Sequence, residues 1–190
     1  MGDNAVGIAV NRAKLSITRG DITRQATDAI VNAANSGLMG GGGVDGAIHR
    51  AGGPTILEEC KQIIARQRRL PIGQAVMTAG GNLSAKYVIH TVGPVWGGGG
   101  KGEATLLASA YRESLKLAAA NKLASVSFPS ISTGVYGYPV DQAVRVALEA
   151  IILFLQKSTT TVKEVVVVLF DSRTFDVYSE ALKEIESKEK

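Results

Sequence analysis

A glycine-rich segment after Asn32 holds residue types that are suited to chemistry. It passes through Asn35 to four consecutive glycines, Gly40–Gly43, and reaches Asp45 at the start of a helical pattern. Backbone amides beside glycine can approach a phosphate closely, and the N-terminus of a helix adds a favourable dipole. The segment therefore predicts an anion-binding loop with a carboxylate close to it. The alternatives are a glycine loop without a ligand, and an Asp45 that only caps the helix.

The same segment matches the dinucleotide fingerprint literally, with glycines at Gly41, Gly43 and Gly46. That fingerprint needs a tight turn directly after its strand, whereas eight residues separate Asn32 from Gly41. The acidic residue expected about 20 residues later is also missing from Ile63–Leu70. The pattern therefore does not indicate a nicotinamide-dependent dehydrogenase.

A second loop with the character of an anion site follows Pro129. Ser130–Pro139 contains hydroxyl side chains, two glycines and the start of another helical pattern. Two such loops at one sheet edge predict a ligand with two phosphates. The alternative is that Gly134 and Gly137 only form the turn.

A third glycine-rich run, Gly97–Gly102, resembles a phosphate-binding P-loop at first sight. Val95 stands where the leading glycine is needed, and Gly102 follows Lys101 in place of a serine or threonine. We expect a mobile loop near the site entrance, with Trp96 making a packing or ligand contact.

Two single residues follow strands at positions where a ligand contact is plausible. Asp21 precedes Ile22 and either shapes a turn, caps a helix or binds a ligand. Phe170 ends the last strand and either joins the core or stacks on a base.

The histidines and the cysteine predict no metal centre. His49 and His90 lack metal-ligand spacing and are expected to be structural or rim residues. Cys60 is the single cysteine, which excludes an internal disulfide and a cysteine cluster, and we expect it on a helix away from the loops. We expect neither a metal nor a cofactor.

The charge balance favours an anionic ligand. The 190 residues carry a formal net charge of +4, which is far below that of a protein that coats nucleic acid. A basic cluster at one helix end is either a solvated face that complements the helix dipole or an RNA contact. Its members are Lys61, Arg66, Arg68 and Arg69.

Short β-branched runs alternate with longer helical patterns, and these elements must position the loops. Expected strands are Gly7–Val10 at an edge, Leu15–Thr18, Ala29–Asn32, Gln74–Thr78, Tyr87–Val92, Val126–Pro129 and Glu164–Phe170. Expected helices are Val44–Ala51, Pro54–Gln67, Glu103–Asn121, Pro139–Gln156 and Thr174–Lys188. The alternation predicts an α/β fold, a three-layer α/β/α sandwich with a central mixed, mainly parallel sheet. In such sheets ligands bind outside the carboxyl ends of the strands.

The chain is expected to form one domain over residues 1–190, with its core over about residues 12–182. The apolar stretch Val144–Leu155 is interrupted by Arg145 and Glu149, so it predicts an amphipathic helix and no membrane span. No export segment is visible, and we expect a cytoplasmic protein.

Taken together, these motifs resemble those of the macrodomains, specifically the MacroD-type ADP-ribosyl hydrolases and the related bacterial O-acetyl-ADP-ribose deacetylases. The resemblance covers nearly the whole chain. It rests on Gly20–Thr23, Ile30–Asn35, Gly40–Ala51, Ile89–Pro94 and Phe128–Pro139.

The resemblance implies a site for ADP-ribose along the strand ends. Asp21 and Ile22 would hold the adenine, and Phe170 would stack on it. The diphosphate would meet the backbone amides of the second loop, at Ser132, Thr133, Gly134, Val135 and Tyr136. The glycine-rich segment would close over the distal ribose and add further substrate contacts, from Asn32, Gly40, Gly41, Gly42, Gly43 and Val44.

By the same resemblance, Asn35 and Asp45 would be the catalytic residues of a hydrolase that cleaves esters from the distal ribose. Its substrates would be O-acetyl-ADP-ribose or proteins ADP-ribosylated on Asp or Glu side chains. A water and a site for the developing charge are required, and a carboxylate such as Asp45 can orient or deprotonate that water. The substrate's own diphosphate is the other candidate base. Two alternatives remain: a module that binds ADP-ribose without turnover, and an RNA-associated regulator of ribonuclease activity.

Overall fold

Seven strands and five α-helices alternate along the chain in the computed structural model, which describes residues 5–157 and 159–188. The strands are β1 (Val6–Val10), β2 (Ala13–Arg19), β3 (Ala29–Ala33), β4 (Ala75–Ala79), β5 (Tyr87–Thr91), β6 (Ser125–Phe128) and β7 (Glu164–Leu169). A short 3-10 helix, η1 (Ile22–Arg24), follows β2.

The helices begin and end close to the positions that the periodic patterns predict. They are α1 (Gly43–Gly52), α2 (Pro54–Gln67), α3 (Glu103–Ala120), α4 (Val140–Lys157) and α5 (Ser172–Lys188). Pro54 occupies the first turn of α2, where the missing backbone N–H has no helical partner to lose. Gly53, with a φ of 75°, makes the corner between α1 and α2.

The strands form one sheet in the order β1-β2-β7-β6-β3-β5-β4. The four inner pairings, β2–β7, β7–β6, β6–β3 and β3–β5, are parallel, and the two outer pairings are antiparallel. The predicted mixed, mainly parallel sheet is therefore confirmed.

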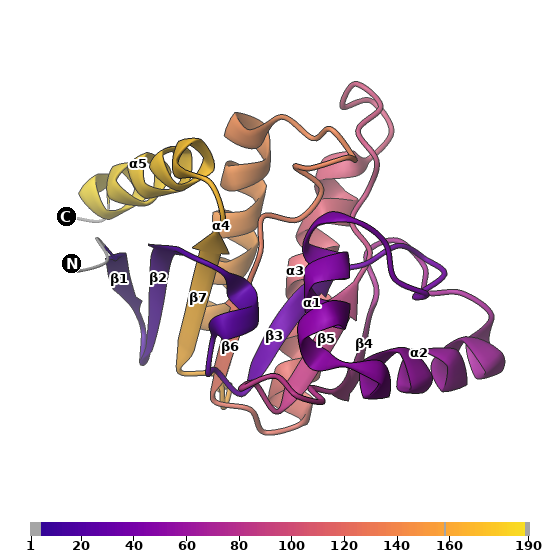
Figure 1. The fold of residues 1–190 in the computed structure, drawn as a ribbon. Helices are drawn as coiled ribbons and strands as arrows, with labels where there is room; N and C mark the ends of the chain where they lie inside the picture. Colours follow the sequence, from indigo (N-terminus) through magenta and orange to yellow (C-terminus); the bar gives the residue numbers. More distant parts are fainter. Residues whose placement is uncertain (1–4, 158, 189–190) are drawn as a thin grey trace.

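The sheet is covered on both faces, as Figure 1 shows. One face packs against α1 and α2 through buried Ile48 and Ile56. The other packs against α3, α4 and α5 through Leu107, Leu148 and Tyr178. Strand β7 contributes alternate valines to the two cores, which explains its uninterrupted apolar sequence.

Because the inner strands are parallel, the loops that follow β2, β7, β6, β3 and β5 all leave the sheet at the same edge. Every glycine-rich or polar loop that the sequence singles out lies there. Among the described residues, no helix is both long enough and apolar enough to cross a membrane.

Candidate functional site

The sequence-predicted site residues lie in a row along the carboxyl edge of the sheet. The strand order places Asp21 after β2, Phe170 after β7, Ser132–Tyr136 after β6 and Asn35 after β3. With neighbouring strands about 4.8 Å apart, three strand spacings give the row a length of roughly 14 Å. An elongated ligand is therefore the kind that could contact all four groups.

Asp21 is a turn residue with one carboxylate oxygen in use. It is the N-cap of η1, and its Oδ1 accepts hydrogen bonds from the backbone N–H of Thr23 (2.9 Å) and from the Thr23 hydroxyl (2.7 Å). The hydroxyl bond, the backbone N–H and nearby Arg24 lower the pKa of Asp21, while partial burial opposes them. The side chain is therefore charged and held in one orientation, and Oδ2 takes part in neither bond.

Phe170 lies on the neighbouring strand end and is not part of the core. Arg19 of β2 pairs with Leu169 of β7, and the Gly20 N–H donates to the Leu169 carbonyl (2.9 Å), so Asp21 and Phe170 follow adjacent paired positions. The Phe170 side chain is 83% exposed. An exposed aromatic ring beside an oriented carboxylate suits a flat, hydrogen-bonding ring such as a nucleobase.

The loop after β6 is tightly turned. The Tyr138 N–H donates to the Ser132 carbonyl (2.9 Å), and the Gly137 N–H donates to the Gly134 carbonyl (3.0 Å). Ser132 has a φ of 67°, in the left-handed region, and its buried hydroxyl lacks a hydrogen-bond partner among the described residues. Strained backbone of this kind concentrates at ligand sites. Val135, at the tip of the loop, is fully exposed.

The Gly97–Gly102 loop is anchored, contrary to the expectation of a mobile loop. The buried Glu103 carboxylate accepts the backbone N–H groups of Gly97 (2.9 Å), Gly99 (3.1 Å) and Lys101 (2.7 Å). Hydrogen bonds from its own backbone N–H and from these three amides lower the pKa of Glu103, against the effect of burial. Trp96 packs on Tyr138, with ring centroids 4.5 Å apart, which supports the packing role over the ligand contact.

The loop after β3 folds back on itself through Asn35. Its Oδ1 accepts the Gly37 N–H (3.1 Å), and its Nδ2 donates to the Gly40 carbonyl (3.1 Å). Helix α1 then begins after Gly42, an N-cap residue without a side chain to accept from the first-turn amides. The helix therefore presents backbone donors and its positive dipole end at this edge.

Asp45 is the third residue of α1 and does not cap it. Its Oδ1 accepts from Asn32 Nδ2 (2.7 Å) and lies 3.3 Å from His49 Nε2, one helical turn later. A Cβ placed on Gly41 would lie 3.1 Å from Asp45 Oδ2 and 3.5 Å from Asn35 Nδ2, so these two groups border the same small space. An amide donor and a carboxylate oxygen around such a space can hold and activate a water.

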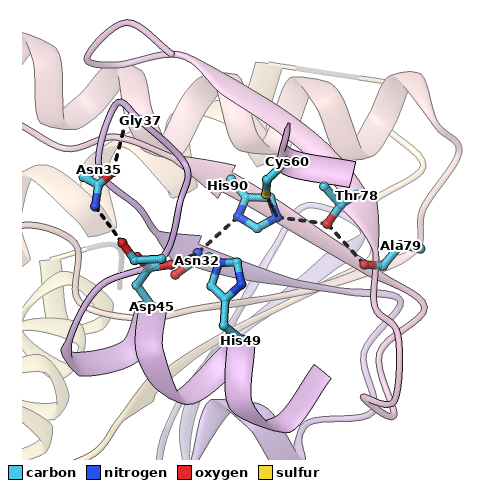
Figure 2. A network of polar contacts seen from close by, with 10 residues as sticks. Asn32, Asn35, Gly37, Asp45, His49, Cys60, Thr78, Ala79 and His90 are labelled. Carbon is cyan, nitrogen blue, oxygen red and sulfur yellow. Dashed lines mark hydrogen bonds and ion pairs between the residues drawn. The ribbon is translucent and has the colours of Figure 1, made fainter. Parts of the chain in front are cut away.

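A row of hydrogen-bonded polar side chains connects Asp45 through Asn32 to His90, as Figure 2 shows. Asn32 is fully buried and donates its second amide hydrogen to His90 Nδ1 (3.1 Å). The Asp45 carboxylate accepts hydrogen bonds, so the NH₂ group of Asn32 faces it. The same NH₂ group donates to His90 Nδ1, which therefore carries no hydrogen. The His90 proton is then on Nε2, 2.9 Å from the Thr78 hydroxyl. Asn32 Oδ1 has no partner within the described part of the chain.

Burial determines the protonation states of His90 and Cys60, which lie at the interior end of this row of polar side chains. It lowers the pKa of His90 to about 3, with His49 adding a smaller effect, so His90 is neutral. Burial, with Asp45 and Glu59, raises the pKa of the Cys60 thiol to about 11. Cys60 lies on helix α2, as expected, and its Sγ is 3.8 Å from His90 Nε2 in strand β5. Its protonated thiol makes a poor nucleophile.

The connection of His49, His90 and Asn32 to Asp45 is not apparent from the sequence motifs. Two signals could have found the connection: His49 lies four residues after Asp45 on one helix, and Asn32 pairs with His90 on adjacent parallel strands. Asn32 was predicted to contact the substrate, but its burial and its two donated hydrogen bonds instead suit a supporting position under Asp45.

Within residues 5–157 and 159–188, no group of three or more His, Cys, Asp or Glu side chains could hold a metal ion. The polar groups that line the edge are single carboxylates, amides and backbone donors. The backbone donors suit the anionic part of an organic ligand, and the carboxylates suit its hydrogen-bond donors.

A family model for the Macro domain matches residues 31–147, more than half of the chain. The chain therefore belongs to the Macro domain family, and the resemblance drawn from its motifs is confirmed.

Particular relatives are similar over nearly their whole length. A macro domain-containing protein of Caldanaerobacter subterraneus subsp. tengcongensis is 55% identical over 175 residues, covering 92% of this chain and 99% of that protein. The O-acetyl-ADP-ribose deacetylase of Klebsiella pneumoniae is 53% identical over 163 residues, covering 86% of this chain and 93% of the relative.

The macrodomain of Oceanobacillus iheyensis, solved with ADP, superposes with a TM-score of 0.94 at 45% identity, covering 99% of this chain and 100% of that chain. A glycine-to-valine variant of it was solved with ADP-ribose, with a TM-score of 0.92 over 96% of this chain and 99% of that chain.

Proposed function

We propose that this macrodomain binds ADP-ribose and hydrolyses esters at its distal ribose. The observation that carries the proposal is the convergence of Asn35 and Asp45 around Gly41, at the β3 end of a row that begins with Asp21. Relatives named O-acetyl-ADP-ribose deacetylase and a homologous macrodomain with bound ADP-ribose support the ligand and the reaction.

In this proposal the strand order is matched to the order of groups in ADP-ribose. Asp21 Oδ2 accepts from the adenine amino group, the Ile22 backbone contacts the ring, and Phe170 stacks on it. The diphosphate is held by backbone amides of Ser132–Tyr136 and of Gly40–Val44 at the start of α1. The distal ribose then lies beside Asn35, where the loop after β3 covers it.

Hydrolysis requires a water aimed at the ester. Asn35 Nδ2 and Asp45 Oδ2 position that water, and Asp45 accepts its proton as its oxygen attacks the acyl carbon. The bond between that carbon and the ribose oxygen breaks, and the ribose oxygen takes up a proton. The products are ADP-ribose and a free carboxylic acid, either acetate or a protein Asp or Glu side chain.

Asn32 has a positioning role in this scheme. Its two amide hydrogens are used by Asp45 Oδ1 and His90 Nδ1, which leaves Asp45 Oδ2 directed toward Gly41. The full burial of Asn32 supports this role over a direct ligand contact.

The test compares single-turnover hydrolysis with equilibrium binding on the same folded protein. For Asp45→Ala we expect turnover of O-acetyl-ADP-ribose and of a Glu-linked ADP-ribosyl peptide to fall about 100-fold or more. Affinity for ADP-ribose should change little, because the adenine and diphosphate contacts remain. Asn35→Ala should behave similarly, and the double variant should be far from additive if both residues hold one water.

Asp45→Asn is the companion variant, because an amide oxygen can still accept from Asn32 while the charge is lost. Asp176→Ala, at an exposed aspartate of α5, is the matched control. Full activity in Asp45→Asn would assign the base to the substrate diphosphate. No turnover in the unchanged protein, with binding intact, would identify a module that binds ADP-ribose without turnover.

A further inference from the structure

A basic surface at the C-terminal end of α2 has no role in the site described above. It consists of Arg66, Arg68 and Arg69, whose side chains are all exposed. None of the three forms an ion pair with any described residue. Between Glu59 and Glu103 the sequence has six Lys and Arg residues and no acidic residue.

This basic surface adjoins the loop that holds Asn35. The Leu70 N–H, directly after the surface, donates to the Ser36 carbonyl (2.9 Å), and Ser36 follows Asn35 in the chain. Figure 1 shows the end of α2 and the loop after β3 coming together on the same side of the molecule. The surface is therefore beside the distal-ribose end of the row, far from Asp21 in the strand order.

Arg68 occupies a backbone position that usually favours glycine. Its φ is 67°, and its N–H closes α2 by donating to the Ile64 carbonyl (2.7 Å). Its ψ is −41°, and the Arg69 N–H donates to the Gln67 carbonyl (2.8 Å), so Arg68 is the central residue of a γ-turn that is rare and strained for a residue with a Cβ. The Arg68 side chain is exposed and forms no ion pair with a described residue, so its guanidinium group is accessible to an external carboxylate.

We propose that this basic surface binds the acidic protein segment to which ADP-ribose is attached, and so selects protein-linked substrates. The proposal rests on the proposed function, because the ester at the distal ribose joins the ligand to its carrier at this end of the row. Guanidinium groups pair with carboxylates in a planar, bidentate geometry, which suits a segment rich in Asp and Glu.

An acidic peptide fits this surface better than a nucleic acid does. Single-stranded nucleic acids are usually held by aromatic side chains on which bases stack. The sequence from Lys61 to Lys86 contains no Phe, Tyr or Trp. Three adjacent cations also cover a short stretch, whereas nucleic-acid binding generally neutralises many phosphates.

The test uses two fluorescent peptides that carry ADP-ribose through a non-hydrolysable linkage, one flanked by Asp and Glu and one by Ser and Gly. Fluorescence anisotropy should show that the unchanged protein binds the acidic peptide about tenfold more tightly, from a few exposed ion pairs. The combined variant Arg66→Gln, Arg68→Gln and Arg69→Gln should bind both peptides equally. About 1 M salt should remove the preference of the unchanged protein, because it screens exposed charges.

The matched control removes the same charge at the opposite edge of the sheet, with Lys122→Gln, Lys157→Gln and Lys163→Gln. It should keep the preference, and hydrolysis of O-acetyl-ADP-ribose should be unchanged in both combined variants. Arg68→Gly should fold at least as stably as the unchanged protein yet lose part of the preference, which separates charge from folding.

Equal binding of the two peptides by the unchanged protein, or a preference that survives in the arginine variant, would overturn the proposal. The proposal would also be overturned if a short single-stranded RNA displaced the acidic peptide at a lower concentration than the unlabelled acidic peptide does, and did not do so with the arginine variant. A protein that prefers the acidic peptide but hydrolyses neither ester substrate keeps this proposal and contradicts the hydrolase function.

Discussion

Asp21 combines a local structural role with the proposed contact to adenine, and the two can be separated. Asp21→Ala removes a charge-assisted hydrogen bond to the ligand, for which we expect a loss of about 1.5–3 kcal/mol, or roughly ten- to 100-fold in affinity. Calorimetry with ADP-ribose on the folded variant measures it.

Asp21→Asn is the informative companion. Its Oδ1 can still accept both hydrogen bonds from Thr23, but an NH₂ group then faces the adenine amino donor. We expect η1 to persist while affinity still falls. An unchanged affinity in Asp21→Asn would remove Asp21 from the adenine contact.

His90 should make the stability of the protein depend on pH in a defined window. Its pKa is about 3 in the folded protein and 6.5 when unperturbed, so between these values only the unfolded chain takes up the proton. The free energy of unfolding should therefore fall as the pH falls, by about 2 kcal/mol between pH 6.5 and pH 5.

Urea unfolding across this range, on the unchanged protein and on His90→Gln, measures that effect. A glutamine can accept from Asn32 and donate to Thr78 without taking up a proton. The variant should lose less stability on acidification, and parallel pH profiles would show that His90 is not the titrating group.

At the scale of single residues, the sequence indicates which side chains could take part in chemistry, but it does not show which groups they form hydrogen bonds with. The types at Asp21, Asn35 and Asp45 indicate their chemistry without a structure. Asp45 accepts a hydrogen bond from Asn32 and does not cap α1, because the helix begins at Gly43. A shift of the helix start by one or two residues would change this role, and sequence patterns do not fix helix ends that closely.

At the scale of elements, prediction succeeded because the patterns are strong. The uninterrupted valines of β7 and the amphipathic pattern of α4 fix type and length, and element ends differ from those predicted by two residues at most. The anchored Gly97–Gly102 loop was beyond reach, because Glu103 accepts from it through side-chain geometry that no periodicity encodes.

The two proposed phosphate loops carry a prediction that tests them as elements. A Cβ on Gly42 or Gly134 would meet no atom of the protein within 4 Å, and neither residue has a positive φ. Gly134→Val should therefore leave thermal stability nearly unchanged, and Gly42→Val should cost at most about 1 kcal/mol, because Gly42 is the N-cap of α1. Both variants should block close approach of the diphosphate.

Affinity for ADP-ribose should fall at least tenfold in each valine variant, which calorimetry and thermal unfolding measure together. Gly100→Val is the matched control, because its Cβ also meets nothing within 4 Å and its φ is not positive. Unchanged affinity at Gly42 or Gly134, or a loss that follows unfolding, would contradict the assignment of that loop.

At the scale of the whole molecule, one ligand that contacts four strand ends should stabilise the entire sheet. At a concentration 100 times its Kd, ADP-ribose should add about 2.7 kcal/mol to the free energy of unfolding. For a protein of this size that corresponds to an increase in Tm of roughly 5–10 °C.

Scanning calorimetry with ADP-ribose and with AMP measures this effect. AMP should give a smaller shift at the same concentration, because it reaches only the β2, β7 and β6 ends of the row. Equal shifts would show that the loop after β3 adds nothing to binding.

The position of β7 between β2 and β6 has a consequence for how the protein is made on the ribosome. The hairpin of β1 and β2 leaves the exit tunnel early, yet the strand that joins it to the rest of the sheet is translated last. Until then, β2 and β6 present unpaired edges, which are the surfaces through which nascent chains aggregate. Asp21 and Phe170 cannot become neighbours before β7 inserts, so the proposed adenine end of the site is the last part to assemble.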